Sequence, residues 1–98
     1  MKPGLAMFAL EGVLEANPWL RDFECPSCPA VEAEDFHACY TWFTTLREPL
    51  NLRRGAYSLK SEVEKLTGEH VGQRAFLAAA IAAGYSVRFS QSGAAYLG

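Results

Sequence analysis

The spacing of the apolar residues changes at Gly84, and no other feature limits the possible folds of this chain as strongly. Before it, over residues 72–83, apolar side chains recur with the period of a helix. After it, over residues 85–90, apolar and polar residues alternate as they do in a half-buried strand. A short turn ending at Gly93, where a positive φ is expected, returns the chain. The sequence therefore predicts a helix over 72–83 and a β-hairpin near 86–97.

A shorter helix is predicted over residues 59–67. Its apolar residues fall at i, i+4 and i+7 on one face: Leu59, Val63 and Leu66. Ser58 is suited to cap its start, and Gly68 can end it in the left-handed conformation, as Gly84 can end the helix that follows. Two helices joined by a tight turn and followed by a hairpin have the outline of a winged helix-turn-helix.

One side of the predicted 72–83 helix allows two interpretations. Arg74 is its only charged residue, and the side opposite the apolar stripe consists of Ala75, Ala78, Ala79 and Ala82. A helix that is apolar on both sides is normally covered on both sides, which predicts a central helix wedged between others. Alternatively, the alanine side is a flat docking face for a partner.

Two further helices are predicted in the first half of the chain, near residues 5–16 and 33–47. Asn17-Pro18 ends the first, because the residue before a proline is disfavoured in the helical conformation. Pro49 breaks the second. The predicted fold class is therefore mainly α with a C-terminal β-hairpin (α+β).

The aromatic and aliphatic residues predict where the core lies. Trp19, Leu20 and Phe23 are expected to anchor an irregular link between the first two helices. The other residues expected in the core come from all the predicted elements: Phe8, Val13, Phe43, Leu59, Val63, Phe76, Leu77, Ile81, Val87 and Phe89.

Charge is distributed unevenly, although the net charge is only −2. Residues 1–46 carry two basic residues against seven acidic ones, about −5, whereas residues 47–98 carry seven against four, about +3. We interpret the chain as a single domain over 1–98 with an acidic helical half and a basic half. Either the halves pack together and partly neutralise each other, or the molecule has two faces that each meet an oppositely charged partner.

Cys25 and Cys28 form a CxxC pair at zinc-binding spacing, with His37 and Cys39 beyond it. A helix over 33–47 places residues two apart at about 200° around its axis, so His37 and Cys39 could not both reach one metal ion. A four-ligand site would need the start of this helix to unwind. We therefore predict three reduced cysteines, no stoichiometric zinc and no other cofactor.

One string of helix-packing residues in the second half is distinctive: Tyr57-x-Leu59-Lys60-x-x-Val63-Glu64, Gly68-x-x-Val71 and Ala75-Phe76-Leu77-Ala78-Ala79-Ala80-Ile81-x-x-Gly84-Tyr85. It resembles small, functionally uncharacterised proteins of bacteriophages and plasmids, over roughly the last two-fifths of the chain. The resemblance implies a mobile-element setting in a bacterial cell. Its most concrete functional example is an anti-CRISPR protein, an inhibitor of a host defence complex. It implies no activity and no functional residue.

No motif in the sequence points to an enzyme or to a membrane protein. Neither histidine is adjacent to a convincing nucleophile, and no glycine-rich phosphate-binding loop is present. No run approaches the length of a membrane span, and Glu11 and Glu15 interrupt the apolar N-terminal patch that a secretory signal would need. We expect a non-enzymatic cytoplasmic protein of a bacterial host cell, without a small-molecule substrate or a membrane partner.

Two binding functions are left. The first is binding to a host protein or protein complex through a rigid face with arginine and aromatic anchors, for which the candidates are Arg53, Arg54, Tyr57, Arg74 and Arg88. The alternative is winged-helix nucleic-acid binding, with His70, Gln73 and Arg74 entering a groove and Arg88 and Gln91 on the wing. A pI near 5.6 and a shortage of base-reading side chains favour protein binding.

The protein-binding hypothesis predicts how charge reversals should act. Reversing Arg74 alone, or Arg53 and Arg54 together, should leave the fold intact and abolish partner capture. Reversing Glu32 and Glu34 should matter less, because that helix start is expected to face solvent.

Overall fold

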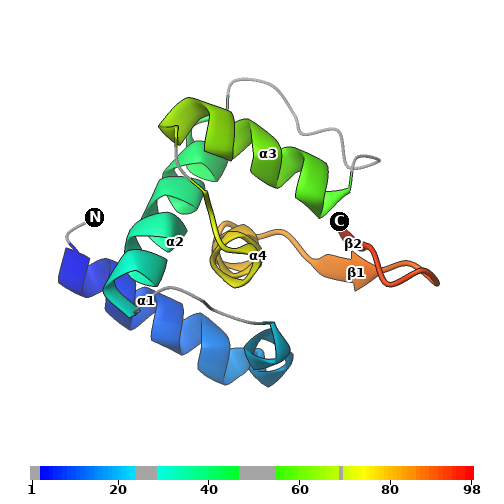
Figure 1. The fold of residues 1–98 in the computed structure, drawn as a ribbon. Coiled ribbons are helices and arrows are strands. Elements are labelled where there is room, and N and C mark those ends of the chain that lie inside the picture. The colour runs from blue at the N-terminus through cyan, green and yellow to red at the C-terminus, as the bar shows by residue number, and fades with distance from the viewer. Residues whose placement is uncertain (1–2, 24–28, 47–54, 69) are drawn as a thin grey trace.

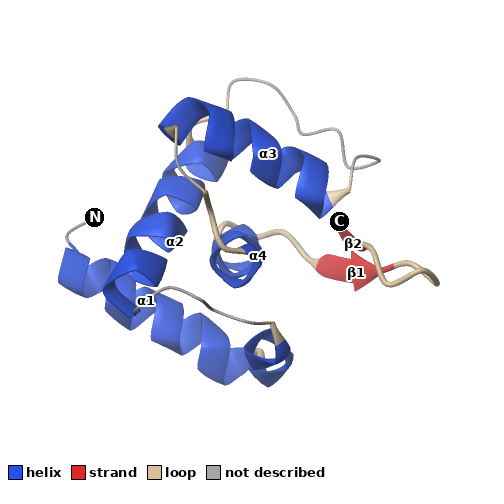
Figure 2. Ribbon diagram, in the orientation of Figure 1, coloured by secondary structure: helices blue, strands red, loops and turns tan. Residues whose placement is uncertain are grey.

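The computed structural model describes residues 3–23, 29–46, 55–68 and 70–98, with the backbone alone for 3–8, 29 and 30. The described elements, in order, are helix α1 (Pro3–Ala16), the 3-10 helix η1 (Pro18–Asp22), helices α2 (Pro29–Thr44), α3 (Ala56–Thr67) and α4 (Gln73–Ala82), and strands β1 (Val87–Phe89) and β2 (Ala95–Leu97). The fold is a compact, mainly α domain that ends in an antiparallel hairpin (Figures 1 and 2), which confirms the predicted fold class.

Helix α4 lies at the centre of the domain. It contacts α1, α2, α3, η1 and β1, and Figure 1 shows it end-on with the other helices and the hairpin around it. Every residue from Ala75 to Ala80 is buried. Alanine lets neighbouring helices approach closely because its side chain is a single methyl group. The interpretation as a wedged central helix is therefore confirmed. The docking-face interpretation is wrong, because Ala82 is the only one of its four alanines that is exposed.

The glycine-terminated helix ends are confirmed. Gly68 ends α3 with φ of 73° and donates its N–H to the Glu64 carbonyl at 2.8 Å. After α4, Gly84 has φ of 101°, and its N–H bonds to the carbonyl of Ile81 while that of Tyr85 bonds to Ala80. This pair of bonds is the Schellman motif, which satisfies the last carbonyls of the helix.

Three helix starts or ends differ from the prediction by three residues or more. Helix α3 begins at Ala56, with Gly55 as its N-cap residue, so Ser58 lies inside its first turn rather than capping it. Helix α2 begins four residues earlier than expected, with Pro29 as its first residue, where proline is well tolerated. It ends at Thr44 rather than at residue 47. The hydroxyl of Thr45 bonds back to the Thr41 carbonyl at 2.8 Å, a local bond that competes with helix continuation. Pro49 lies outside the described residues.

The hairpin pairs Val87 with Leu97 and Phe89 with Ala95. These four residues share one face, on which Ala95 and Leu97 are buried against the helices. Tyr96, in β2, also forms an isolated bridge with Gly55, which joins the hairpin to the start of α3.

The core agrees with the prediction in most positions. Phe43, Leu59, Val63, Phe76 and Leu77 are buried, and Val13, Ile81 and Val87 are partly buried against them. Phe89 was expected in the core but is 49% exposed, because β1 ends there, away from α4. Leu66, expected on the buried face of α3, is 74% exposed in its last turn. The side chain of Phe8 lies outside the described residues.

Within the described ranges, no helix has both the length and the apolar character needed to cross a membrane.

Candidate functional site

Three aromatic side chains from η1 and β1 form a partly exposed cluster, which we call the aromatic patch: Trp19, Phe23 and Phe89. The rings of Phe23 and Phe89 are stacked with centroids 6.4 Å apart. Trp19 meets Phe89 edge to face at 5.6 Å and Phe23 at 6.3 Å. Aromatic side chains that combine a large contact area with few rotatable bonds are typical anchors of protein interfaces.

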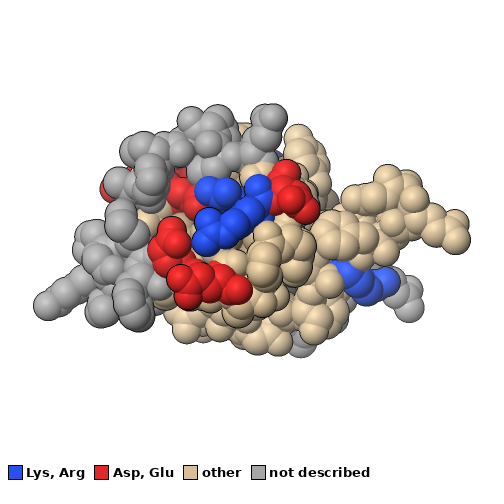
Figure 3. All heavy atoms as spheres, turned by 90° about the horizontal axis from the view of Figure 1, so that it is seen from below, with Lys and Arg blue, Asp and Glu red and all other residues tan. Residues whose placement is uncertain are grey.

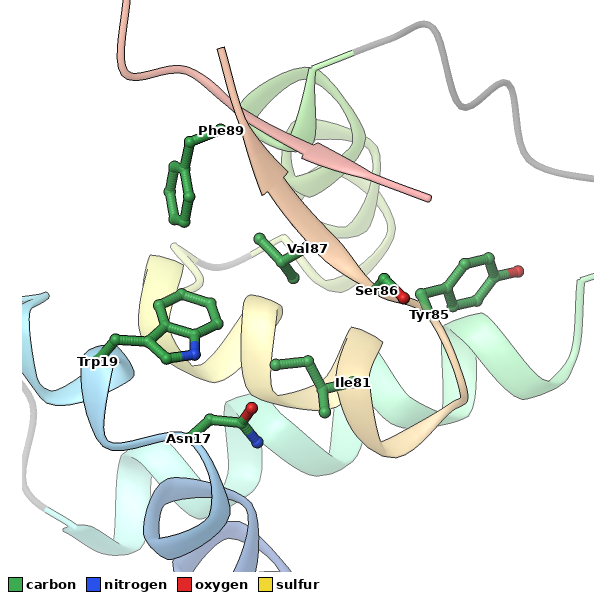
Figure 4. A pocket seen from close by; sticks show the side chains of 7 residues that line it. All are labelled: Asn17, Trp19, Ile81, Tyr85, Ser86, Val87 and Phe89. Carbon is green, nitrogen blue, oxygen red and sulfur yellow. The ribbon is translucent and has the colours of Figure 1, made fainter. Parts of the chain in front are cut away.

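A cleft of about 470 Å³ adjoins the aromatic patch. Figure 4 shows Phe89, Val87, Trp19 and Ile81 converging on it, while the ring of Tyr85 points away, and Tyr85 packs against Phe43 in the core. The full lining is Asn17, Trp19, Ile81, Tyr85, Ser86, Val87 and Phe89. The cleft is therefore bounded by η1, the C-terminal end of α4 and the inner face of β1.

Local sequence features place the two sides of the aromatic patch. Pro18 starts η1 directly after α1, and Leu20, which is fully buried, fixes this turn to the core. Trp19 and Phe23 flank this anchor and are left half-buried. On β1 the alternation of the strand turns Val87 and Phe89 to the same face. Sequence analysis identified these aromatic residues but assigned them to the core.

The described contacts do not bring the residues that were predicted to bind a partner together on one surface. Tyr57 is 72% exposed on α3, where the Lys60 ammonium lies 5.2 Å from its ring. The guanidinium of Arg88, on β1, lies 5.3 Å from the ring of Tyr96. Arg74 faces α2 instead. Arg53 and Arg54 lie outside the described residues.

Arg74 takes part in an ion pair inside the fold. Its Nε and Nη2 donate to Oε2 of Glu32 at 3.0 and 2.7 Å. Only 5% of the Glu32 side chain and 19% of the Arg74 side chain are exposed. Glu32 therefore does not face solvent as expected; its neighbour Glu34 does. The expectation that reversing Arg74 leaves the fold intact fails on the same ground, since reversal would place two carboxylates together in a largely buried position.

A second polar cluster, which we call the turn clamp, spans the turn between α3 and α4. Oε2 of Glu64 accepts a hydrogen bond from the backbone N–H of Val71 at 2.9 Å and lies 2.8 Å from Nδ1 of His70. The Lys60 ammonium, almost fully buried, donates to the Val71 carbonyl at 3.1 Å and lies 3.9 Å from the same carboxylate oxygen. An i, i+4 pair such as Lys60 and Glu64 is ordinarily a weak contact on a helix surface. Burial turns it into a structural clamp that fixes the turn.

The central position of α4 weighs against groove reading by this helix. A recognition helix must present one face to the bases, but α4 is buried from Ala75 to Ala80. Of the proposed contact residues at its start, Arg74 is held by Glu32, and Nδ1 of His70 lies 2.8 Å from the Glu64 carboxylate. Figure 3 shows basic side chains on one face of the molecule interleaved with acidic ones rather than gathered into a stripe.

His37 and Cys39 both lie within α2, as the predicted helix required. Cys39 is fully buried, and this burial raises the pKa of its thiol from 9.0 to about 12, with a smaller contribution from the nearby Asp35 carboxylate. A thiol held protonated in this way is a poor metal ligand and nucleophile. Among the described residues there is no group of three or more potential metal ligands, and Cys25 and Cys28 are not among those residues.

The fold and the patch together define a small, mainly α domain with an aromatic surface beside its hairpin. Comparison with known protein families, with curated proteins and with solved structures finds no match for this chain.

Proposed function

We propose that this protein is a small, non-enzymatic mobile-element protein that acts by binding another protein through its aromatic patch. Its most concrete form is an inhibitor of a host defence complex in the bacterial cytoplasm, of anti-CRISPR type. The mobile-element setting and the inhibitor role come from the resemblance of the C-terminal string to phage and plasmid proteins.

The observation that carries the proposal is the position of Phe89. It is a large apolar residue, 49% exposed, that contacts two other aromatic rings and borders a cleft with a mostly apolar lining. Clustered exposed apolar side chains are uncommon on monomeric proteins and mark interaction sites more often than isolated ones do. The desolvated anchors of an interface are commonly aromatic residues that enter such a contact.

Nucleic-acid binding is the weaker alternative. The order of α3, α4 and the hairpin favours it, because that order is shared with winged helices. The burial of α4 and the net charge of −2 oppose it.

The test is capture from a bacterial lysate with the tagged protein, with and without nuclease treatment. We expect a protein partner that is retained after nuclease and lost with Phe89→Ser. Leu66→Ser is the matched control, because it removes an apolar side chain that is even more exposed, at 74%, from α3. Capture that survives Phe89→Ser, or that disappears on nuclease treatment, would contradict the proposal.

A further inference from the structure

The hydrogen-bond register of the hairpin determines which backbone groups of β1 face outward. Ser86 and Gly98 exchange two backbone hydrogen bonds, with N···O distances of 3.0 and 2.8 Å. Bonded and non-bonded pairs alternate along an antiparallel ladder. The pair two residues further on, Arg88 and Tyr96, is therefore also a bonded pair.

It follows that the N–H and C=O groups of Val87 and Phe89 point away from β2. Neither residue's outward groups have a hydrogen-bond partner in the described part of the chain. The outer edge of β2, in contrast, is already covered, because β2 is bridged to Gly55 and packs against α3. The edge of β1 is therefore the side of this sheet on which another strand can pair.

The same two residues also border the cleft. Their side chains, on the inner face of β1, converge with Trp19 on the cleft (Figure 4). A strand added to β1 would continue the sheet over η1 and lay every second side chain on Trp19 and Phe23. A two-stranded sheet is marginal, and a third strand with an apolar face adds to its stability.

The charge of Arg88 determines which side chain suits the other face of an added strand. Arg88 lies between Val87 and Phe89 on β1 and is exposed on the opposite face. Its guanidinium lies over the ring of Tyr96 and forms no ion pair within the described ranges. An acidic residue directly across from Arg88 would form a favourable cross-strand pair.

We propose that β1 binds an extended segment of a partner protein by strand addition, and that this segment has an acidic residue between two apolar residues. Backbone hydrogen bonds to Val87 and Phe89 give the affinity, and the cleft and Arg88 select the side chains. The inference rests on the proposed protein-binding function and specifies its mode.

The probe is the capped, labelled peptide Val-Thr-Leu-Glu-Phe-Thr-Val, measured by fluorescence anisotropy on the whole protein. Two further versions carry N-methyl groups, one on Leu and Phe and the other on Glu and the Thr that follows Phe. Antiparallel addition turns the amides of Leu and Phe toward β1, and parallel addition turns the other set. We expect one version to bind about tenfold more weakly than the parent and the other within about twofold. Equal affinity of the two methylated versions, or no saturable binding of the parent up to about 1 mM, overturns strand addition.

An ester in place of the Val87 amide, introduced with the α-hydroxy acid, removes the outward N–H and keeps the side chain. We expect it to weaken probe binding about three- to tenfold. It should lower the melting temperature less than the same change at Arg88, because at Val87 the ester only weakens the Ser86 carbonyl as the acceptor of the Gly98 N–H. The same change at Arg88 removes an N–H bonded to Tyr96, so it should lower the melting temperature. If a partner captured from the lysate depends on Phe89 but binds the Val87 ester with unchanged affinity, strand addition is refuted and the proposed function is not. Failure to capture any partner through the aromatic patch refutes the proposed function.

Discussion

Arg74 and Glu32, 42 residues apart in the chain, meet through two hydrogen bonds to a single carboxylate oxygen. This contact joins the first turn of α4 to the first turn of α2. It converts a residue that the sequence suggested as a surface anchor into part of the framework.

Removing one partner of this pair should destabilise the protein. We expect Arg74→Ala to lower the free energy of unfolding by about 3 kcal/mol, because it leaves the Glu32 carboxylate buried without its main counter-charge. Urea unfolding gives the value. The double variant Glu32→Ala with Arg74→Ala should recover much of the loss, and Arg21→Ala, at an exposed site, is the control. Strictly additive effects would show that the pair is not coupled.

Enlarging an alanine of α4 should also be costly. Ala79 is fully buried, so Ala79→Leu should destabilise by about 2 kcal/mol or more through overpacking. Ala82→Leu places the same side chain on the exposed part of the helix and should change stability by less than about 0.5 kcal/mol. Thermal unfolding of the two variants compares them directly. Similar losses from both would contradict the central position of α4.

The Cys39 thiol should make stability fall in alkaline solution. Its pKa is raised to about 12 in the folded protein, above the ordinary value of 9.0. Above about pH 9 the unfolded chain releases this proton and the folded protein keeps it. The free energy of unfolding should therefore decrease by about 1.4 kcal/mol per pH unit, until the folded thiol also ionises. The difference between the wild type and Cys39→Ala in urea unfolding at several pH values isolates this contribution.

The same thiol should resist labelling. In a Cys25→Ser, Cys28→Ser background at about pH 8, a disulfide reagent should modify Cys39 only as fast as the protein unfolds. Rapid labelling without denaturant would show that Cys39 is accessible.

Loss of the turn clamp should loosen the helix-turn-helix. We expect Glu64→Ala to cost about 2 kcal/mol, since it leaves the Val71 N–H without its acceptor and the buried Lys60 ammonium without its counter-charge. Hydrogen exchange should show the Val71 amide exchanging faster in this variant. Glu15→Ala, at an exposed position on α1, is the control. An unchanged exchange rate at Val71 would mean that the carboxylate does not hold the turn.

Free nucleic acid should bind weakly. The basic residues of the second half are diluted by acidic ones, and Arg74 is already paired. Few phosphates can be neutralised, so the dependence of affinity on salt should be shallow. Titration of duplex DNA at several salt concentrations measures it. Tight binding at physiological salt with a steep slope would instead support the winged-helix alternative.

The C-terminal half could be predicted from the sequence because its signals are local. Gly68 and Gly84 mark helix ends by backbone conformation alone, and the period-two alternation marks β1. The position of the helix start at Ala56 was missed because Ser58 matched a capping pattern that the backbone does not use. Whether the helix begins at Ala56 or at residue 59 is decided by the fold and not by the local sequence.

The candidate site could not be predicted in the same way. Trp19 and Phe23 are far from Phe89 in the chain, and their contact depends on where η1 docks. An apolar residue in a strand is assigned to the core by default, and only the short length of β1 leaves Phe89 at the surface. The Arg74–Glu32 pair is likewise a long-range contact that neither local segment signals.

Because α4 touches each of the other helices and β1, none of these elements can open widely without disturbing it. Its backbone amides should then exchange with solvent only through unfolding of the whole domain. A partner bound at the surface, even one that contacts only β1 and η1, would suppress that unfolding by mass action. Slower exchange at the centre of the protein therefore reports an event at its edge. This makes deuterium uptake in α4, or a simple shift in melting temperature, a screen for partners that requires no knowledge of where they bind.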